Sequence, residues 1–343
     1  MPGSTRTWSR ATFILAALFL TACAQLSGTV RVNVGVGLIE DQPAPNYAAL
    51  YLPYARMASI AYTDVKFLKG GAGPTRYCPD AYRLAHERPD TRDQAERNPN
   101  NLEWLNELQA NGWRCIYALN DPRECPADNP SCDPVRGLEL HVWMKGCEAV
   151  IAFRGTDYDQ RGDWQSNLRW FLGPLHLFDE YRQVEFHMSS ILGRISRVCR
   201  SAHIVTTGHS LGGGLAQRAA YSAGGRIRFV YAFDPSPVVG YFDLPREVRI
   251  KARTGLGIDQ VYEVGEVLDF PRFFLGGFAN PQPCNPRVRI VRFNLTNTGS
   301  AVEQHAMQAL TRKMERPARY GNPAKAREES KARDCTFVTP APV

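Results

Sequence analysis

The sequence predicts a protein of the α/β class, with a mostly parallel central sheet and helices on both of its faces. Beyond residue 200, short apolar runs alternate with helix-like segments, as in strands joined by crossover helices. Before that region, residues 138–144 alternate in polarity, Lys145-Gly146 can turn, and residues 147–153 form a second apolar run, which is typical of a hairpin. A serine at a strand-to-helix corner is the third observation.

Each element follows from the local pattern. Residues 51–62 have apolar side chains at helical spacing, and a long helix is expected over residues 179–197. Alternating valines at residues 30–36 indicate a short edge strand. The other expected elements are a helix around 102–108, strands at 204–205, 229–233, 261–264 and 288–293, a helix over 212–222, and a last helix after His305.

Ser210 stands at the corner between a predicted strand and a predicted helix. Residues 206–214 read Thr-Thr-Gly-His-Ser-Leu-Gly-Gly-Gly, directly after the apolar pair Ile204 and Val205. A nucleophile elbow needs this order, because its strained turn requires glycines and presents the serine oxygen at the positive end of the helix. The Gly-x-Ser-x-Gly pattern alone is moderately specific, and the strand and small-residue helix around it strengthen the prediction.

The first residues resemble an export signal. Arg6 and Arg10 precede an apolar stretch over residues 11–20, which is too short to span a bilayer but suits a secretory signal. Leu-Thr-Ala-Cys at residues 20–23 resembles a bacterial lipobox, so residues 1–22 are expected to be a signal peptide and Cys23 the lipid-modified first residue. The alternative is an ordinary signal that leaves Cys23 free. No aspartate follows the cysteine, which favours an exported, outer-membrane lipoprotein anchored to the membrane by this lipid.

Composition divides the remaining chain. Residues 24–45 are expected to be a tether, residues 46–314 one α/β domain, and residues 315–343 a basic C-terminal tail. Residues 69–137 are rich in Pro, Gly, Asn, Asp and charge, so they are interpreted as a disulfide-stapled insertion too polar to bury its own core.

Cysteine usage fits an exported protein. Of nine cysteines, eight remain besides Cys23, and an even number in an oxidising compartment suggests up to four disulfides. Cys125 with Cys132 is the best local pair, and Cys284 with Cys335 is a weaker one. No Cys-x-x-Cys pair exists, so a metal site is not expected.

The net charge is modestly positive. Without residues 1–22 the formal charge of +7 falls to +5, which suits either an anionic membrane surface or an ordinary solvated face. Nothing in the sequence resembles a nucleic-acid-binding module.

A serine nucleophile needs a base, a carboxylate that orients the base, and donors for the developing oxyanion. His305 is the one histidine after the elbow, and it precedes a predicted helix, so it is the expected base. The expected acid is Glu266, which follows the second strand after the elbow. Asp269 and Asp234 remain alternatives.

Two backbone positions are expected to donate to the oxyanion. One is Leu211, the first residue of the helix after the elbow, and the other is Thr156, where the predicted strand at residues 150–153 runs into Arg-Gly-Thr. His209 is beside the serine but is expected to pack elsewhere on the elbow rather than to act as the base.

Three motifs together resemble the class 3 lipase family. They are Ala-Phe-Arg-Gly-Thr-Asp at residues 152–157, Asp-Trp-x-x-Asn-Leu at residues 163–168, and Gly-His-Ser-Leu-Gly-Gly at residues 208–213, in the family's order and spacing. The resemblance implies an α/β-hydrolase fold, a triad of Ser210, an acid near residues 266–271 and His305, and an oxyanion hole at Thr156 and the residue after the serine. The family's acid is normally aspartate, so Glu266 departs from its pattern.

These observations favour a serine carboxylic ester hydrolase that cleaves acyl esters of lipids through an acyl-enzyme, with no cofactor and no metal. Two alternatives stay open. One is an acyltransferase that uses the same triad, and the other is a non-catalytic envelope lipoprotein that keeps the fold.

Overall fold

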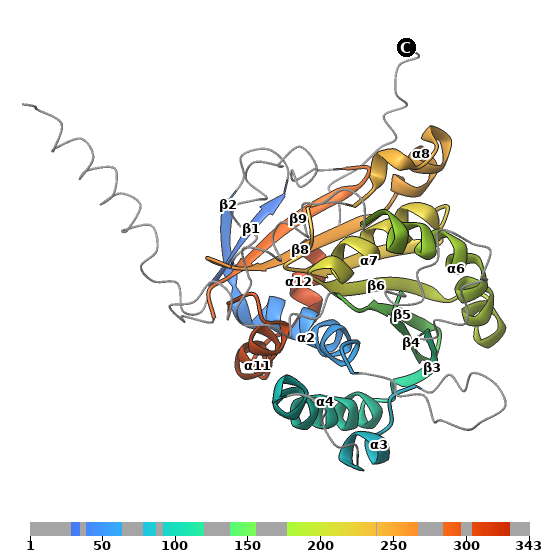
Figure 1. Ribbon diagram of the computed structural model, residues 1–343. Helices are drawn as coiled ribbons and strands as arrows, with labels where there is room; N and C mark the ends of the chain where they lie inside the picture. Colours follow the sequence, from blue (N-terminus) through green and yellow to red (C-terminus); the bar gives the residue numbers. More distant parts are fainter. Residues whose placement is uncertain are drawn as a thin grey trace, which may run out of the picture.

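The described residues of the computed structural model build one nine-stranded sheet with helices on both faces (Figure 1). The structure describes residues 29–34, 39–63, 78–86, 92–119, 138–155, 177–237, 239–266, 284–295 and 304–329. The strand order is β2-β1-β9-β8-β7-β6-β5-β4-β3. The strands are β1 (Thr29–Val34), β2 (Ile39–Pro43), β3 (Arg114–Leu119), β4 (Leu140–Lys145), β5 (Glu148–Phe153), β6 (His203–His209), β7 (Ile227–Phe233), β8 (Gly257–Glu263) and β9 (Arg287–Phe293).

The centre of the sheet is parallel and its two edges are antiparallel. Strands β5 to β9 run parallel in chain order, whereas β4 and β3 on one side and β1 and β2 on the other pair antiparallel. Since parallel neighbours need crossover connections, described helices lie between β5 and β6, between β6 and β7 and between β7 and β8. The described helices are α2 (Ala44–Ile60), α3 (Ala81–His86), α4 (Arg92–Ala110), α6 (Leu177–Val198), α7 (Leu211–Ser222), η2 (Tyr241–Asp243), α8 (Arg246–Arg253), α11 (Met307–Ala318) and α12 (Pro323–Glu329).

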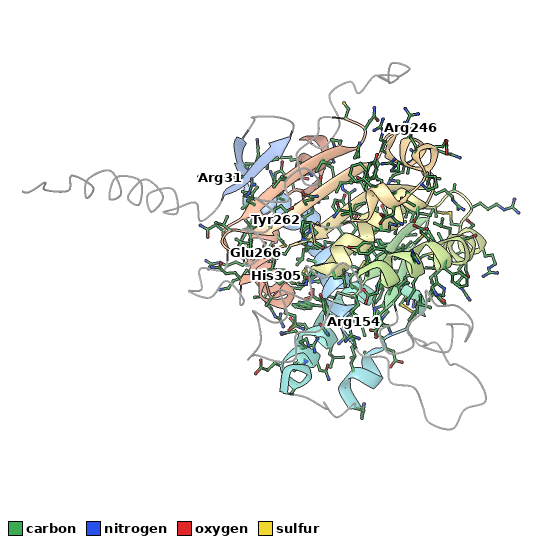
Figure 2. The ribbon with its side chains drawn as sticks, turned by 45° about the horizontal axis from the view of Figure 1, so that its top comes forward. Arg31, Arg154, Arg246, Tyr262, Glu266 and His305 are labelled. Carbon is green, nitrogen blue, oxygen red and sulfur yellow. A yellow bond between two sulfur atoms is a disulfide. The ribbon has the colours of Figure 1, made fainter. Side chains whose placement is uncertain are left out.

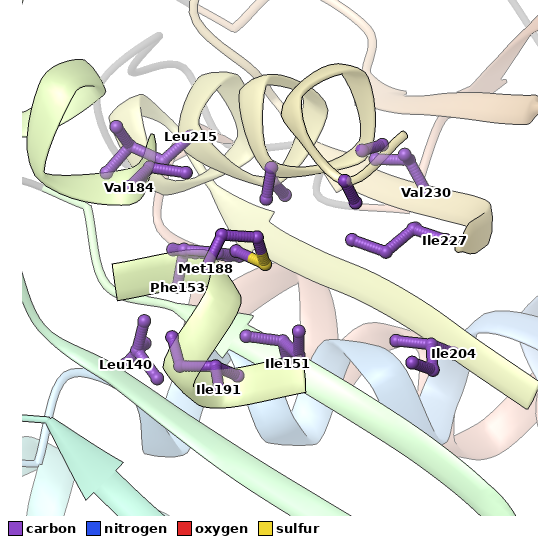
Figure 3. Close-up of a cluster of buried hydrophobic side chains, with 14 of the residues drawn as sticks. Leu140, Ile151, Phe153, Val184, Met188, Ile191, Ile204, Leu215, Ile227 and Val230 are labelled. Carbon is purple, nitrogen blue, oxygen red and sulfur yellow. The ribbon is translucent and has the colours of Figure 1, made fainter. Parts of the chain in front are cut away.

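Each face of the sheet has its own apolar core. On one face, α6 and α7 pack over the central strands, with Met188 and Ile191 of α6 set against Ile151 of β5 (Figure 3). On the other face, α2 is covered by α11 and α12, and its buried side chains meet those of β5 to β9 (Figure 1). Apolar residues on both faces explain why the central strands are continuous apolar runs. With the serine corner at the carboxyl end of central strand β6, this is an α/β-hydrolase fold.

Segments expected to be a tether and a tail contribute to the fold. Residues 29–34 and 39–43, within the expected tether, form β1 and β2, and β1 pairs with β9. The expected basic tail begins inside α11 and continues into α12, where Ala326 is fully buried. The short edge strand expected from the alternating valines corresponds to β1, whereas β2 and the seven-residue α12 carry too little periodicity to be expected from the sequence.

The expected insertion also takes part in the sheet. Its strand β3 pairs with β4 as the edge of the sheet, and α4 buries Trp104, Leu105 and Leu108 against α2. Residues 92–119 of the expected insertion therefore bury their apolar side chains against the main domain rather than in a core of their own. Three large apolar side chains on one face of α4 find their partner in α2, far away in the sequence.

Two disulfides join described residues, Cys78–Cys115 and Cys147–Cys199. Cys284 is also disulfide-bonded. Cys125, Cys132 and Cys335 lie outside the described residues, so the two pairings expected from the sequence stay predictions. No helix within the described part of the chain has the length and apolar character that crossing a membrane requires.

Candidate active site

Ser210 occupies a strained corner between β6 and α7. Its backbone has φ 56° and ψ −124°, in a region that L-residues rarely adopt. The Ser210 N–H donates to the carbonyl of Phe233 at 3.0 Å, and the Ser210 carbonyl accepts the N–H of Ser236 at 2.9 Å. The start of the loop after β7 therefore fixes both sides of the corner. Strain of this kind persists only where surrounding contacts over-determine it, and it gathers at functional sites.

The glycines on either side of Ser210 let three chain segments meet. A Cβ at Gly208 would lie 2.3 Å from the carbonyl oxygen of Gly212, because the first turn of α7 folds back onto β6. A Cβ at Gly212 would lie 2.5 Å from the carbonyl oxygen of Phe153, at the end of β5. Both distances are shorter than any real Cβ contact, so the pattern Gly-x-Ser-x-Gly is a packing requirement of this corner.

The end of β5 lies against the elbow. Phe153 pairs with Gly208 in the parallel register of β5 and β6, so Gly155 is beside the serine corner. A Cβ at Gly155 would lie 2.5 Å from the His209 carbonyl and 3.3 Å from the backbone nitrogen of Gly212. Leu211 opens α7, whose first N–H groups have no partner within the helix and form its positive end. Thr156, the other expected oxyanion donor, lies outside the described residues.

His305 and Glu266 form a buried hydrogen-bonded pair. The Nδ1 atom of His305 is 2.8 Å from Oε2 of Glu266, and their side chains are 3% and 0% exposed. Glu266 follows β8 after a turn at Gly265 (φ +82°), and His305 lies two residues before α11. Figure 2 shows the two residues beside each other at one end of the sheet. A carboxylate at Nδ1 favours the tautomer that keeps a lone pair on Nε2, which is the arrangement a general base requires.

His209 holds the backbone of His305 at the elbow. Its Nε2 is 2.7 Å from the carbonyl oxygen of His305, and its Nδ1 is 2.9 Å from the hydroxyl of Tyr62. The two imidazole rings are 4.7 Å apart between centroids. Nε2 donates to a carbonyl, so in the neutral tautomer Nδ1 accepts the Tyr62 hydroxyl, and both ring nitrogens of His209 are engaged. Sequence reasoning missed Tyr62, which lies just past the end of α2 and gives no local signal for this contact.

The alternative acids differ in their surroundings. Asp234 is fully buried with φ 39°, and its Oδ1 accepts the backbone N–H of Glu263 at 3.1 Å. Asp269 lies outside the described residues.

His209, Asp234 and His305 each offer a potential metal-ligand atom, and these atoms lie within 4.8 Å of one another. A metal bound by His209 would displace either Tyr62 or the carbonyl of His305.

Comparisons with known proteins cover the part of the chain that contains the elbow. Residues 135–229, from before β4 to within β7, match the family described as a Tle-like phospholipase domain. An extracellular phospholipase A1 of Serratia liquefaciens is 33% identical over 92 residues, which are 27% of this chain and 26% of that protein. The chain thus matches about a quarter of that relative's length. Glu266 and His305 lie outside the family match.

Solved lipase structures resemble the chain only weakly. Lipase II of Rhizopus niveus is 14% identical, with a TM-score of 0.40 over 71% of this chain and 79% of that one. Rhizomucor miehei lipase with its propeptide is also 14% identical, with a TM-score of 0.37 over 75% of this chain and 76% of that one. Since both scores are below 0.5, the fold assignment depends on the strand order and the elbow of this chain itself.

Proposed function

We propose that this protein is a serine carboxylic ester hydrolase that cleaves the acyl esters of glycerophospholipids through an acyl-enzyme. The observation that carries the proposal is the buried pair of His305 and Glu266, 2.8 Å apart, held against the strained Ser210 corner by His209. A nucleophile, a base and an orienting carboxylate on neighbouring strand ends are the parts that acyl transfer needs.

Each residue has a role in the proposed reaction. His305 takes the proton of Ser210 through Nε2 as the serine oxygen attacks the ester carbonyl, and it later returns that proton to the leaving alcohol. Glu266 orients His305 and stabilises the imidazolium. The backbone N–H groups of Leu211 and Thr156 hold the oxyanion, and a second attack by water releases the fatty acid. The class 3 lipase resemblance supports the same assignments.

A phospholipid substrate is favoured over other acyl esters by the two sequence comparisons. Both the family that matches residues 135–229 and the relative from Serratia liquefaciens carry the word phospholipase in their descriptions. The relative's name places its cleavage at the first acyl position of the glycerol. We propose the same position for this chain.

The test uses a phosphatidylcholine with different acyl chains at its two glycerol positions. Wild type is expected to release the chain of the first position, and Ser210→Ala is expected to lose about a thousandfold or more in kcat/KM. Ser222→Ala, at the end of α7 away from the elbow, is the matched control. Retained activity in Ser210→Ala would refute the assignment of the nucleophile. No release from wild type, together with no labelling by a fluorophosphonate, would favour a non-catalytic lipoprotein.

The acyltransferase alternative differs only in the acceptor. A transferase would form a new ester when an alcohol such as glycerol is added, whereas a hydrolase releases the free acid. Mass spectrometry of the products with and without the acceptor separates the two, and we expect free acid to dominate.

Export and anchoring belong to the same proposal. Disulfides at Cys78–Cys115 and Cys147–Cys199 fit an oxidising compartment. We propose that Cys23 carries a lipid that holds the enzyme at the outer membrane. Metabolic labelling with a tagged fatty acid is expected to mark wild type and not Cys23→Ala. Labelling of both would refute the anchor.

A further inference from the structure

A cavity of about 380 Å³ lies at the end of the sheet opposite Ser210. Its lining includes Glu148, His203, Gly257 and Arg287, which are the first residues of β5, β6, β8 and β9. Val205 of β6 also lines the cavity and lies five positions before Ser210. At about 3.3 Å per residue the strand separates the two by roughly 16 Å, which makes the cavity distinct from the site of ester hydrolysis.

Four aromatic side chains form much of the cavity wall. Tyr54 comes from α2, Trp113 precedes β3, and Phe229 and Tyr231 come from β7. The ring centroids of Tyr54 and Tyr231 are 4.2 Å apart, and those of Phe229 and Tyr231 are 5.8 Å apart with nearly parallel planes. These rings offer flat apolar surface to an occupant, as ligand-binding cavities commonly do.

A buried charged cluster reaches the cavity through Arg287. Asp259 of β8 accepts hydrogen bonds from Arg289 at 3.0 and 2.5 Å, from Tyr51 at 2.9 Å and from Arg287 at 3.1 Å. Burial raises the pKa of Asp259, but the charges of Arg289 and Arg287 outweigh that effect and lower it overall, so Asp259 is ionised. One carboxylate thus faces two guanidinium groups, and the cluster has a net charge of +1.

The surplus charge lies on Arg287. Four donors use the acceptor capacity of the Asp259 carboxylate, and Nη1 of Arg287 is buried with no hydrogen-bond partner among the described residues. The Arg287 side chain is 6% exposed, lines the cavity and lies over the ring of Phe229 at 5.5 Å. Arg327 adds a second cation to the lining, and Glu148 is the one acid among the described lining residues. An unpaired buried donor is costly, and an anion is the partner that would satisfy it best.

We propose that this cavity binds an amphiphilic organic monoanion, with its carboxylate or sulfonate at Arg287 and its apolar body between the aromatic walls. The shared chemistry covers two sources, a fatty acid and an aromatic acid. Binding here does not depend on the proposed hydrolysis, since the two places are at opposite ends of the strands.

The experiment compares two fluorescent dyes that share an apolar body and differ in charge. Anilinonaphthalene sulfonate is anionic, and N-phenylnaphthylamine is its neutral counterpart. Wild type is expected to bind the anionic dye saturably and at least about tenfold more tightly than the neutral one, because a charge-assisted hydrogen bond contributes that much. Decanoate or naphthoate is expected to displace the dye, whereas their amides are not. Equal binding of the two dyes, or displacement by amides, would overturn the proposal.

Two variants locate the binding. Arg287→Gln is expected to reduce the preference for the anionic dye to about threefold or less. Because this change could unfold the buried cluster, His203→Trp provides an independent test, since the exposed His203 lies at the cavity lining and a larger ring there blocks the entrance. His203→Trp is expected to weaken the anionic dye about tenfold, and His86→Trp, an equally exposed change on α3, is expected to have no effect. Unchanged affinity in His203→Trp would refute the location.

Discussion

A buried histidine is expected to limit the stability of this protein in acid. His141 lies in β4 with 3% of its surface exposed, and burial, aided by the positive charge of Arg154, lowers its pKa to about 3. Its Nδ1 is buried without a hydrogen-bond partner within the described structure. In the unfolded chain the pKa of a histidine is about 6.5. As pH falls, the unfolded state therefore binds a proton that the folded state cannot accept.

The size of the effect follows from these two pKa values. Since the folded value is the lower one, the contribution of His141 is complete above about pH 6.5 and is lost as pH falls toward 3. pH 5 is about 1.5 units below the pKa of the histidine in the unfolded chain. Protonation of the unfolded chain therefore lowers the free energy of unfolding at pH 5 by about 2 kcal/mol. Against a typical total stability of about 5–15 kcal/mol, this loss is large enough to measure.

Urea unfolding at pH 7.5 and pH 5 tests the reasoning. His141→Phe keeps the size of the ring and removes its titration, so the loss of unfolding free energy between the two pH values should shrink by about 2 kcal/mol. Gly193→Ala, which removes no titratable group and has open space at its Cβ, should leave the loss unchanged. If His141→Phe loses as much stability in acid as wild type, the reasoning about burial is wrong.

Three further predictions concern the site and the sheet. Glu266→Gln should lower kcat by about a thousandfold or more, measured with an acyl nitrophenyl ester, because a neutral amide favours the wrong tautomer of His305. If Glu266→Gln is nearly as active as wild type and Asp234→Asn is inactive, Asp234 is the acid. Asp259→Asn should cost about 3–5 kcal/mol in urea unfolding, since it leaves two buried guanidinium groups without a counter-charge. Gly208→Ala should prevent normal folding or lower stability by more than about 2 kcal/mol, seen in a thermal melt, whereas Gly193→Ala, with open space at its Cβ, should be tolerated.

The central strands and the elbow could be predicted because their signals are local. The apolar run before Ser210, the glycines around it and the small residues after it all lie within a dozen positions, and the structure has β6 and α7 there. The expected helix over residues 179–197 corresponds to α6, whose apolar side chains recur at helical spacing. The parallel pairing of the later strands followed from the alternation of strand and helix.

Contacts between distant segments could not be predicted in this way. Tyr62 meets His209 across 147 positions, and no feature of either sequence neighbourhood indicates the other. The same holds for α4, which is polar along most of its length and is held by a few large side chains against α2. The cavity is a still stronger case, because residues of the five strands β5 to β9, of α2 and of α12 contribute to it.

The buried ion pair in the middle of the sheet links its two ends. Asp259 and Arg289 are register partners of β8 and β9, and their hydrogen bonds fix how these strands align. Glu266 follows the carboxyl end of β8, and the chain reaches His305 after the end of β9. A slip of one residue would move one segment by about 3.3 Å relative to the other, which exceeds the tolerance of a 2.8 Å hydrogen bond. The register set by Asp259 is therefore a condition for the pairing of Glu266 with His305. Asp259→Asn should consequently reduce ester hydrolysis even at temperatures where the variant remains folded.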